Sequence, residues 1–238
     1  MGAFRQRRPG QIRTLIILAI AAGLLVAGLV GMSTREPSHE YDDVQGVQDM
    51  RQVIGGERQL EDRLGEVDAP VQMQVFLDAQ SSTYRDQFLE TIPPLINSQV
   101  RSGDLKLLYR NRSLTRNATE LSFYGIEAAM NQNYGWQFAY LMFRNQAQAE
   151  EQGLDEEFLT RLAESIEHLD IEQWKADFND GLEEGSQMNA ELQAQDQLAI
   201  DLEIRDAPAA VVNGANGTEI LQDAPDLAEI EAAIDKVG

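Results

Sequence analysis

A strand, a helix and a second strand can be traced in the hydrophobic pattern of residues 71–110, and this succession leaves few folds open. Residues 71–77 (VQMQVFL) and 105–110 (LKLLYR) have the alternating or apolar composition of strands. Pro93 and Pro94 lie in the helix predicted between these two strands and should kink or restart it. A strand–helix–strand unit predicts a parallel pair of strands and an α/β fold. The helical stripe consists of Phe88, Leu89, Ile92, Leu95, Ile96 and Val100.

The remaining patterns complete an α/β chain with a large helical segment. Strand patterns return at residues 209–213 and 218–221, and residues 226–237 have the spacing of an acidic amphipathic helix. We therefore predict three parts: a first β-α-β half at residues 67–116, a helical insertion at 117–200, and a second β-β-α half at 201–238.

An apolar run near the N-terminus predicts a membrane anchor. Thr14–Met32 has 19 residues and no charge, and as a helix of about 28 Å it matches the hydrocarbon core of a bilayer. Residues 1–13 carry four arginines and no acid, which places them in the cytoplasm and the rest of the chain outside. We expect a single-pass signal-anchor in the cell membrane, with a cleaved signal peptide as the alternative. Residues 33–66 are expected to form a juxtamembrane spacer that includes a short helix near Val47–Ile54.

The composition excludes several kinds of chemistry. The chain has no cysteine, so it forms no disulfide, thiolate nucleophile or zinc–sulfur site. Two histidines are too few for a multi-histidine metal centre, and we expect neither a metal nor a cofactor. The 40 acidic residues exceed the 19 basic ones and give a formal charge of −21, which argues against a nucleic-acid partner.

Three segments occur in an order that resembles one protein family. Asp68–Arg85 (DAPVQMQVFLDAQSSTYR) is similar to the segment that opens the fold in the DsbA-like branch of thioredoxin-fold proteins. Gly135–Gln146 (GWQFAYLMFRNQ) resembles the aromatic-rich helix of that branch's insertion, and Ile204–Gly214 (IRDAPAAVVNG) resembles its proline-containing segment. The resemblance covers about residues 66–238. It implies an extracytoplasmic thioredoxin-like fold with a helical insertion, related to thiol-disulfide oxidoreductases.

The chain departs from this family at the redox site. The resemblance implies a Cys-x-x-Cys motif at the start of the first helix. In the alignment that we prefer, the two cysteine positions fall on Ser81 and Tyr84; shifted by one residue, they fall on Ser82 and Arg85. Neither alignment supplies sulfur, so we predict a degenerate member with no catalytic residue. The relic active-site positions are Ser81, Ser82, Thr83, Tyr84 and Arg85.

The relic positions have two compatible interpretations. Ser81, Ser82 and Thr83 are residues that typically cap a helix, because their oxygens accept hydrogen bonds from free backbone N–H groups. The resemblance also implies a cis proline beside the active-site helix. A groove between the relic positions and that proline would hold an extended polypeptide by strand-like pairing, without sulfur. The predicted cis-proline loop is Asp206, Ala207 and Pro208.

Three functions follow from this reading. The first is a membrane-anchored protein that binds partner or unfolded polypeptides and exchanges no disulfides. The second is an enzyme similar to kappa-class glutathione transferases and isomerases, in which Ser81 would stabilise the thiolate of a bound small thiol. The third is a purely structural ectodomain of a membrane complex. We favour the first, and leave enzymatic activity open with a preference for none.

Overall fold

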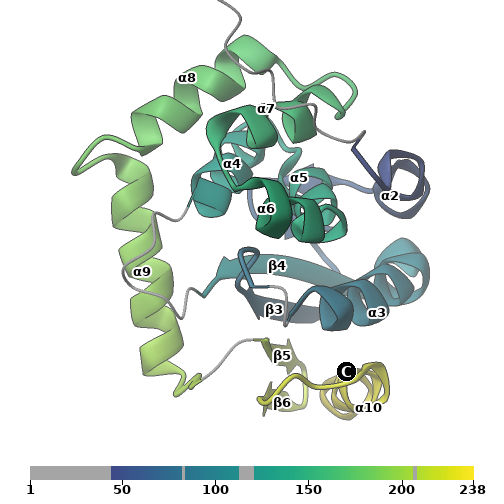
Figure 1. Ribbon diagram of the computed structural model, residues 1–238. Coiled ribbons are helices and arrows are strands. Elements are labelled where there is room, and N and C mark those ends of the chain that lie inside the picture. Colours follow the sequence, from purple (N-terminus) through teal and green to yellow (C-terminus); the bar gives the residue numbers. More distant parts are fainter. Residues whose placement is uncertain (1–43, 82–83, 113–120, 206–207) are drawn as a thin grey trace, which may run out of the picture. The chain divides into compact units, whose positions relative to one another are not determined.

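A single mixed sheet organises the chain, whose computed structural model describes residues 44–81, 84–112, 121–205 and 208–238 (Figure 1). Its strands are β1 (Gln59–Leu60), β2 (Arg63–Leu64), β3 (Val71–Leu77), β4 (Leu105–Asn111), β5 (Ala209–Gly214) and β6 (Gly217–Leu221). Their spatial order is β1-β2-β4-β3-β5-β6. β3 and β4 run parallel, and the other neighbouring strands are antiparallel. The predicted α/β class and the predicted parallel pair are therefore confirmed.

The parallel pair is connected by helix α3 (Arg85–Leu95), which continues as the π-helical turn η2 (Ile96–Val100). Pro93 and Pro94 lie in the last turn of α3 and have no N–H to donate to the preceding turn. The helix changes its hydrogen-bonding pattern directly after them, where a kink or restart was predicted.

The predicted insertion forms helices between β4 and β5. Asp155, Asp170 and Ser186 each accept a backbone N–H at the start of their helix, which explains why three of the helices begin where they do. Gly125 permits tight packing in this layer, because a Cβ there would lie 2.9 Å from the Phe138 ring. The helices are α4 (Leu121–Met130), α5 (Gly135–Arg144), α6 (Gln146–Gln152), α7 (Glu156–Glu164), α8 (Ile171–Gly181) and α9 (Gln187–Asp201).

Helices cover both faces of the sheet (Figure 1). The alternation of β3 sends Val71, Met73 and Val75 into the main core, together with residues of α3 and of α10 (Leu227–Val237). Phe76 points to the opposite face, where it packs with Ala199 from the end of α9 and with residues of β5. Helix α9 therefore runs along the second face and leads from the insertion into β5.

The prediction of a spacer at residues 33–66 is wrong for residues 44–66, which belong to the folded domain. The short helix is present as α2 (Val47–Ile54), but it packs against the domain, and its Met50 and Ile54 are buried. β1 and β2 also belong to the sheet. Each has only two residues, so neither contains an apolar run that a sequence pattern could detect. Residues 33–43 lie outside the described residues.

The predicted membrane segment, Thr14–Met32, also lies outside the described residues. Among the helices that are described, none combines the length and apolarity needed to cross a bilayer.

Candidate functional site

The ends of β3 and β5 bring the two predicted halves of the site together. Phe76 pairs with Ala209, so the residues that follow β3 lie beside the residue that precedes β5. Ser81 belongs to the first group, and Pro208 is the second. The loop that contains Ser81 and the proline, 127 residues later in the chain, therefore leave the sheet at the same end. A groove between them stays a prediction.

A series of hydrogen bonds shapes the loop between β3 and α3. The buried Asp78 accepts the Gln80 N–H through Oδ1 at 2.9 Å, and its carbonyl accepts the Ser81 N–H at 3.2 Å. The Ser81 carbonyl accepts the N–H of Tyr84 at 3.1 Å. This turn leaves the side chains of Ser81 and Tyr84 half-buried.

Helix α3 does not begin where the serines predicted. Its first residue is Arg85 and its N-cap position is Tyr84, which makes no side-chain capping hydrogen bond. Ser81 lies three residues before that position, so it is not the N-cap of α3. Ser82 and Thr83 lie outside the described residues. Arg85 pairs with the neighbouring Asp86 at 2.9 Å.

Two residues of the insertion support this loop from behind. Gln146, at the start of α6, is almost wholly buried and donates through Nε2 to the Ala79 carbonyl at 2.8 Å. Phe143 of α5 stacks on Phe88 of α3 with ring centroids 4.2 Å apart. Sequence reasoning did not assign Gln146 this role, because its partner lies 67 residues away.

The other side of the site is built around Pro208, which is buried. Its carbonyl accepts the N–H of Ala224 at 3.0 Å. Gln87 of α3 donates to the carbonyl of Pro225 at 2.7 Å, which ties the helix to the same segment. Asp206 and Ala207 lie outside the described residues, so the predicted cis bond before Pro208 stays a prediction.

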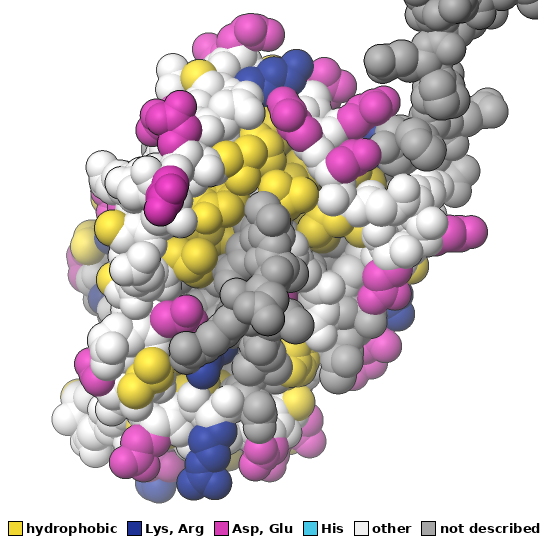
Figure 2. Space-filling model, turned by 60° about the vertical axis from the view of Figure 1, so that its left-hand side comes forward, with side chains coloured by type: hydrophobic (Ala, Val, Ile, Leu, Met, Phe, Trp, Pro, Cys, Tyr) yellow, Lys and Arg dark blue, Asp and Glu magenta, His cyan; other side chains and the backbone are white. Residues whose placement is uncertain are grey.

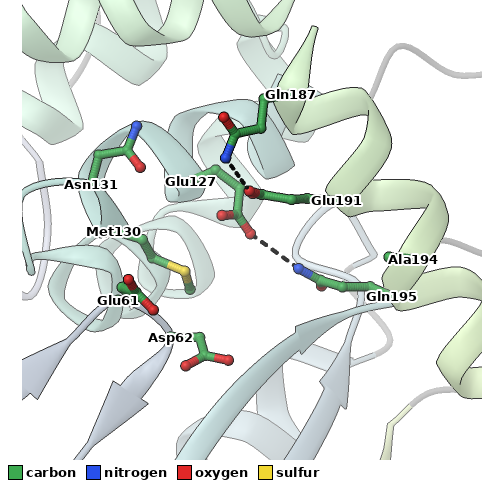
Figure 3. A pocket seen from close by; sticks show the side chains of 9 residues that line it. All are labelled: Glu61, Asp62, Glu127, Met130, Asn131, Gln187, Glu191, Ala194 and Gln195. Atoms are coloured by element: carbon green, nitrogen blue, oxygen red, sulfur yellow. Dashed lines mark hydrogen bonds between the residues drawn. The ribbon is translucent and has the colours of Figure 1, made fainter. Parts of the chain in front are cut away.

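A second feature is a pocket of about 350 Å³ between α4, α9 and the β1–β2 turn (Figure 3). Glu127 of α4 is 7% exposed and lies among apolar neighbours of its own helix. Burial, followed by the charge of Glu191, raises the pKa of Glu127 to about 7. Sequence reasoning missed this residue, although a single acid in an otherwise apolar helix was a signal. The pocket is lined by Glu61, Asp62, Glu127, Met130, Asn131, Gln187, Glu191, Ala194 and Gln195.

The surface is acidic, as the composition requires. Figure 2 shows one face on which hydrophobic side chains form an area bordered by many Asp and Glu and few Lys and Arg. No group of His, Asp and Glu suited to hold a metal ion occurs among residues 44–81, 84–112, 121–205 and 208–238.

Comparison with known proteins agrees with this architecture. The profile of a family described as "Thioredoxin" matches residues 59–236. The "Probable disulfide bond formation protein D" of Bacillus anthracis is 25% identical over 176 residues, which cover 73% of this chain and 76% of that protein. The crystal structure of oxidised BdbD from Bacillus subtilis has a TM-score of 0.59 at 20% identity, covering 76% of this chain and 96% of that one. Wolbachia pipientis alpha-DsbA1 gives the same TM-score at 15% identity, with 76% and 90% covered.

The chain therefore belongs to the thioredoxin family, and its fold is DsbA-like. It is a degenerate member in one definite respect, because it contains no cysteine.

Proposed function

We propose that this protein is a membrane-anchored, extracytoplasmic DsbA-like protein that binds extended polypeptides beside Ser81 and Pro208 and exchanges no disulfides. Disulfide exchange requires a thiolate that attacks a sulfur atom, and a serine hydroxyl cannot replace it. The loss of the chemistry leaves the shape of the site in place.

The observation that carries the proposal is that the relic loop follows β3 at the same end of the sheet at which Pro208 precedes β5. The pairing of Phe76 with Ala209 supports the proposal because the relic loop and Pro208 then leave the sheet at the same end, and Gln146 holds the relic loop through the carbonyl of Ala79. An extended peptide held beside Ser81 and Pro208 would gain affinity from main-chain hydrogen bonds, and pockets for its side chains would add specificity. Tyr84 offers an aromatic ring and a hydroxyl to such a ligand.

The location is argued from the sequence. The uncharged Thr14–Met32 run follows four arginines, and both features support an anchor with the folded domain outside. Cysteine-scanning accessibility in intact cells tests this topology, since the natural chain has no background thiol. Labelling of a cysteine placed at the exposed Gln193 by a membrane-impermeant maleimide is expected; labelling only after lysis would reverse the orientation.

Peptide binding is tested with the full-length protein in detergent micelles. A fluorescent, cysteine-free unfolded polypeptide is titrated, and its anisotropy is measured with wild type, Tyr84→Ala and Pro208→Ala. Each substitution is expected to weaken binding by about fivefold or more, the usual effect of truncating a central contact residue.

Matched controls exist for both variants. Pro70→Ala removes an exposed proline, and Tyr134→Ala removes a half-buried tyrosine at the start of α5. Both controls should bind as wild type does. Equal binding by all five proteins would refute the groove, and no binding by folded wild type would favour a structural ectodomain. Retention on immobilised glutathione, lost in Ser81→Ala, would favour the enzyme instead.

A further inference from the structure

Polar contacts in the middle of helix α9 attach it to the rest of the domain. Only Met188 and Ala199 of its 15 residues are buried. In its middle, Gln195 accepts the backbone N–H of Asn111, at the end of β4, at 2.6 Å. The next residue, Asp196, pairs with Arg112 at 3.0 Å.

The same glutamine reaches the buried acid of α4. Gln195 donates through Nε2 to Glu127 at 3.3 Å while its Oε1 serves Asn111. One side chain thus joins α9 to both β4 and α4, and Glu127 is the partner that can change its charge. One turn earlier on α9, Glu191 points into the same pocket, held by Gln187 at 3.0 Å (Figure 3).

The charges around Glu127 are unbalanced. Two nearby carboxylates, Glu191 of α9 and Asp62 of the β1–β2 turn, raise the pKa of Glu127. Glu61 lines the same pocket. Arg110 of β4 is the cation that lowers the pKa of Glu127, but Arg110 is already paired with Asp62. Among the ion pairs of the described residues, none includes Glu127 or Glu191. When both are ionised, two carboxylates therefore face each other across the seam between α4 and α9.

We propose that protonation of Glu127 controls how closely α9 packs against α4 and β4, and we call the pair Glu127 and Glu191 the latch. When Glu127 is protonated, α9 packs closely against both elements (the seated state). When Glu127 loses its proton, α9 packs less closely (the loosened state). The protonated carboxyl keeps an oxygen that accepts from Gln195 and no longer repels Glu191. The ionised form must stay largely buried beside a like charge, and it is relieved when α9 moves away. The proposal concerns the seating of α9 alone and does not depend on peptide binding.

The latch has a route to the candidate site. Helix α9 ends at Asp201, seven residues before Pro208. Ala199, near that end, and Ile204, just beyond it, pack with Phe76, Ala209 and Val211 on the second face of the sheet. A change in the seating of α9 therefore acts on the segment that leads into β5.

Hydrogen exchange of the α9 amides in the full-length protein tests the latch. Exchange is followed by mass spectrometry between pH 6 and pH 8 and corrected for the intrinsic rate. With a pKa of about 7 for Glu127 in the seated state and its ordinary value of 4.5 in the loosened state, opening of α9 is expected to increase about tenfold across this range.

Two variants decide the outcome. Glu127→Gln is nearly isosteric with the protonated acid and should keep α9 protected at both pH values. Glu191→Gln, at a half-buried position, should reduce the pH dependence without risk to the core. Glu184→Gln changes the net charge equally at an exposed site before α9 and should behave as wild type. Undiminished pH dependence in Glu127→Gln and Glu191→Gln, or none in wild type, would overturn the latch.

Discussion

At the scale of single residues, Glu127 is where protonation and stability are most closely linked. Its pKa is raised from 4.5 to about 7, so between these values the folded protein binds more protons than the unfolded chain. The contribution of Glu127 to the free energy of unfolding is therefore fully present below pH 4.5 and is lost as the pH rises through 7. This contribution is at most about 3 kcal/mol.

The matching prediction is that Glu127→Gln is more stable than wild type at pH 8 and that this advantage shrinks toward pH 4.5. Urea unfolding at several pH values measures the difference between the two proteins, which removes the contribution of the other carboxyl groups. The exposed Glu184→Gln serves as the control and should show no such trend. A constant difference between Glu127→Gln and wild type would show that Glu127 titrates normally.

The relic positions make a residue-scale prediction of a different kind. Cysteines at 81 and 84 stand where the preferred alignment places the lost pair, directly before α3. The double variant Ser81→Cys/Tyr84→Cys should acquire insulin-reduction activity, because a helix N-terminus favours a reactive thiolate. Ser82→Cys/Arg85→Cys is the pair of the shifted alignment, and the preferred alignment predicts that it is less active. Higher activity of this second pair would correct the alignment by one residue.

At the scale of secondary-structure elements, α6 is the element that positions the relic loop. Replacing Gln146 by Ala removes a buried donor and leaves the Ala79 carbonyl without it. We expect a loss of about 1–3 kcal/mol in unfolding free energy and weaker peptide binding in the anisotropy titration. Gln193→Ala, at an exposed position of α9, is the control and should change neither quantity. Lower stability with unchanged affinity would show that α6 does not position the binding site.

The elements also show what the sequence could predict. The β3-α3-β4 unit was predictable because its strands alternate apolar and polar residues over most of their length and its helix has a clear apolar stripe. β1 and β2 were not, since two-residue strands have no periodicity. The expected proximity of Ser81 and Pro208 came from family resemblance, and the pairing of Phe76 with Ala209 shows that their segments leave the sheet at the same end. The bond from Gln195 to Glu127 joins two helices, and hydrophobic patterns carry no signal for such a contact.

At the scale of the whole molecule, the folded domain begins earlier than the sequence indicated. Met50 and Ile54 are buried, Asn145 accepts the N–H of Gln45 at 2.7 Å, and Arg101 donates to the carbonyl of Val53 at 2.9 Å. A fragment that begins at residue 60 should therefore be less stable than one that begins at 42, by at least about 2–5 kcal/mol, the usual cost of losing one large core side chain. Urea unfolding compares the two fragments, and equal midpoints would return residues 42–59 to the role of a spacer.

The claim that unites these scales is that a polypeptide binds where the redox site would be. Ser81→Cys in the full-length protein tests it directly, because its lone thiolate attacks a thionitrobenzoate-activated cysteine on an unfolded polypeptide and releases thionitrobenzoate. The rate is normalised to that with a small activated thiol and compared with exposed Ser102→Cys. We predict a rate about tenfold or more above the control, slowed by excess cysteine-free polypeptide. Equal normalised rates, unaffected by the competitor, would contradict the claim.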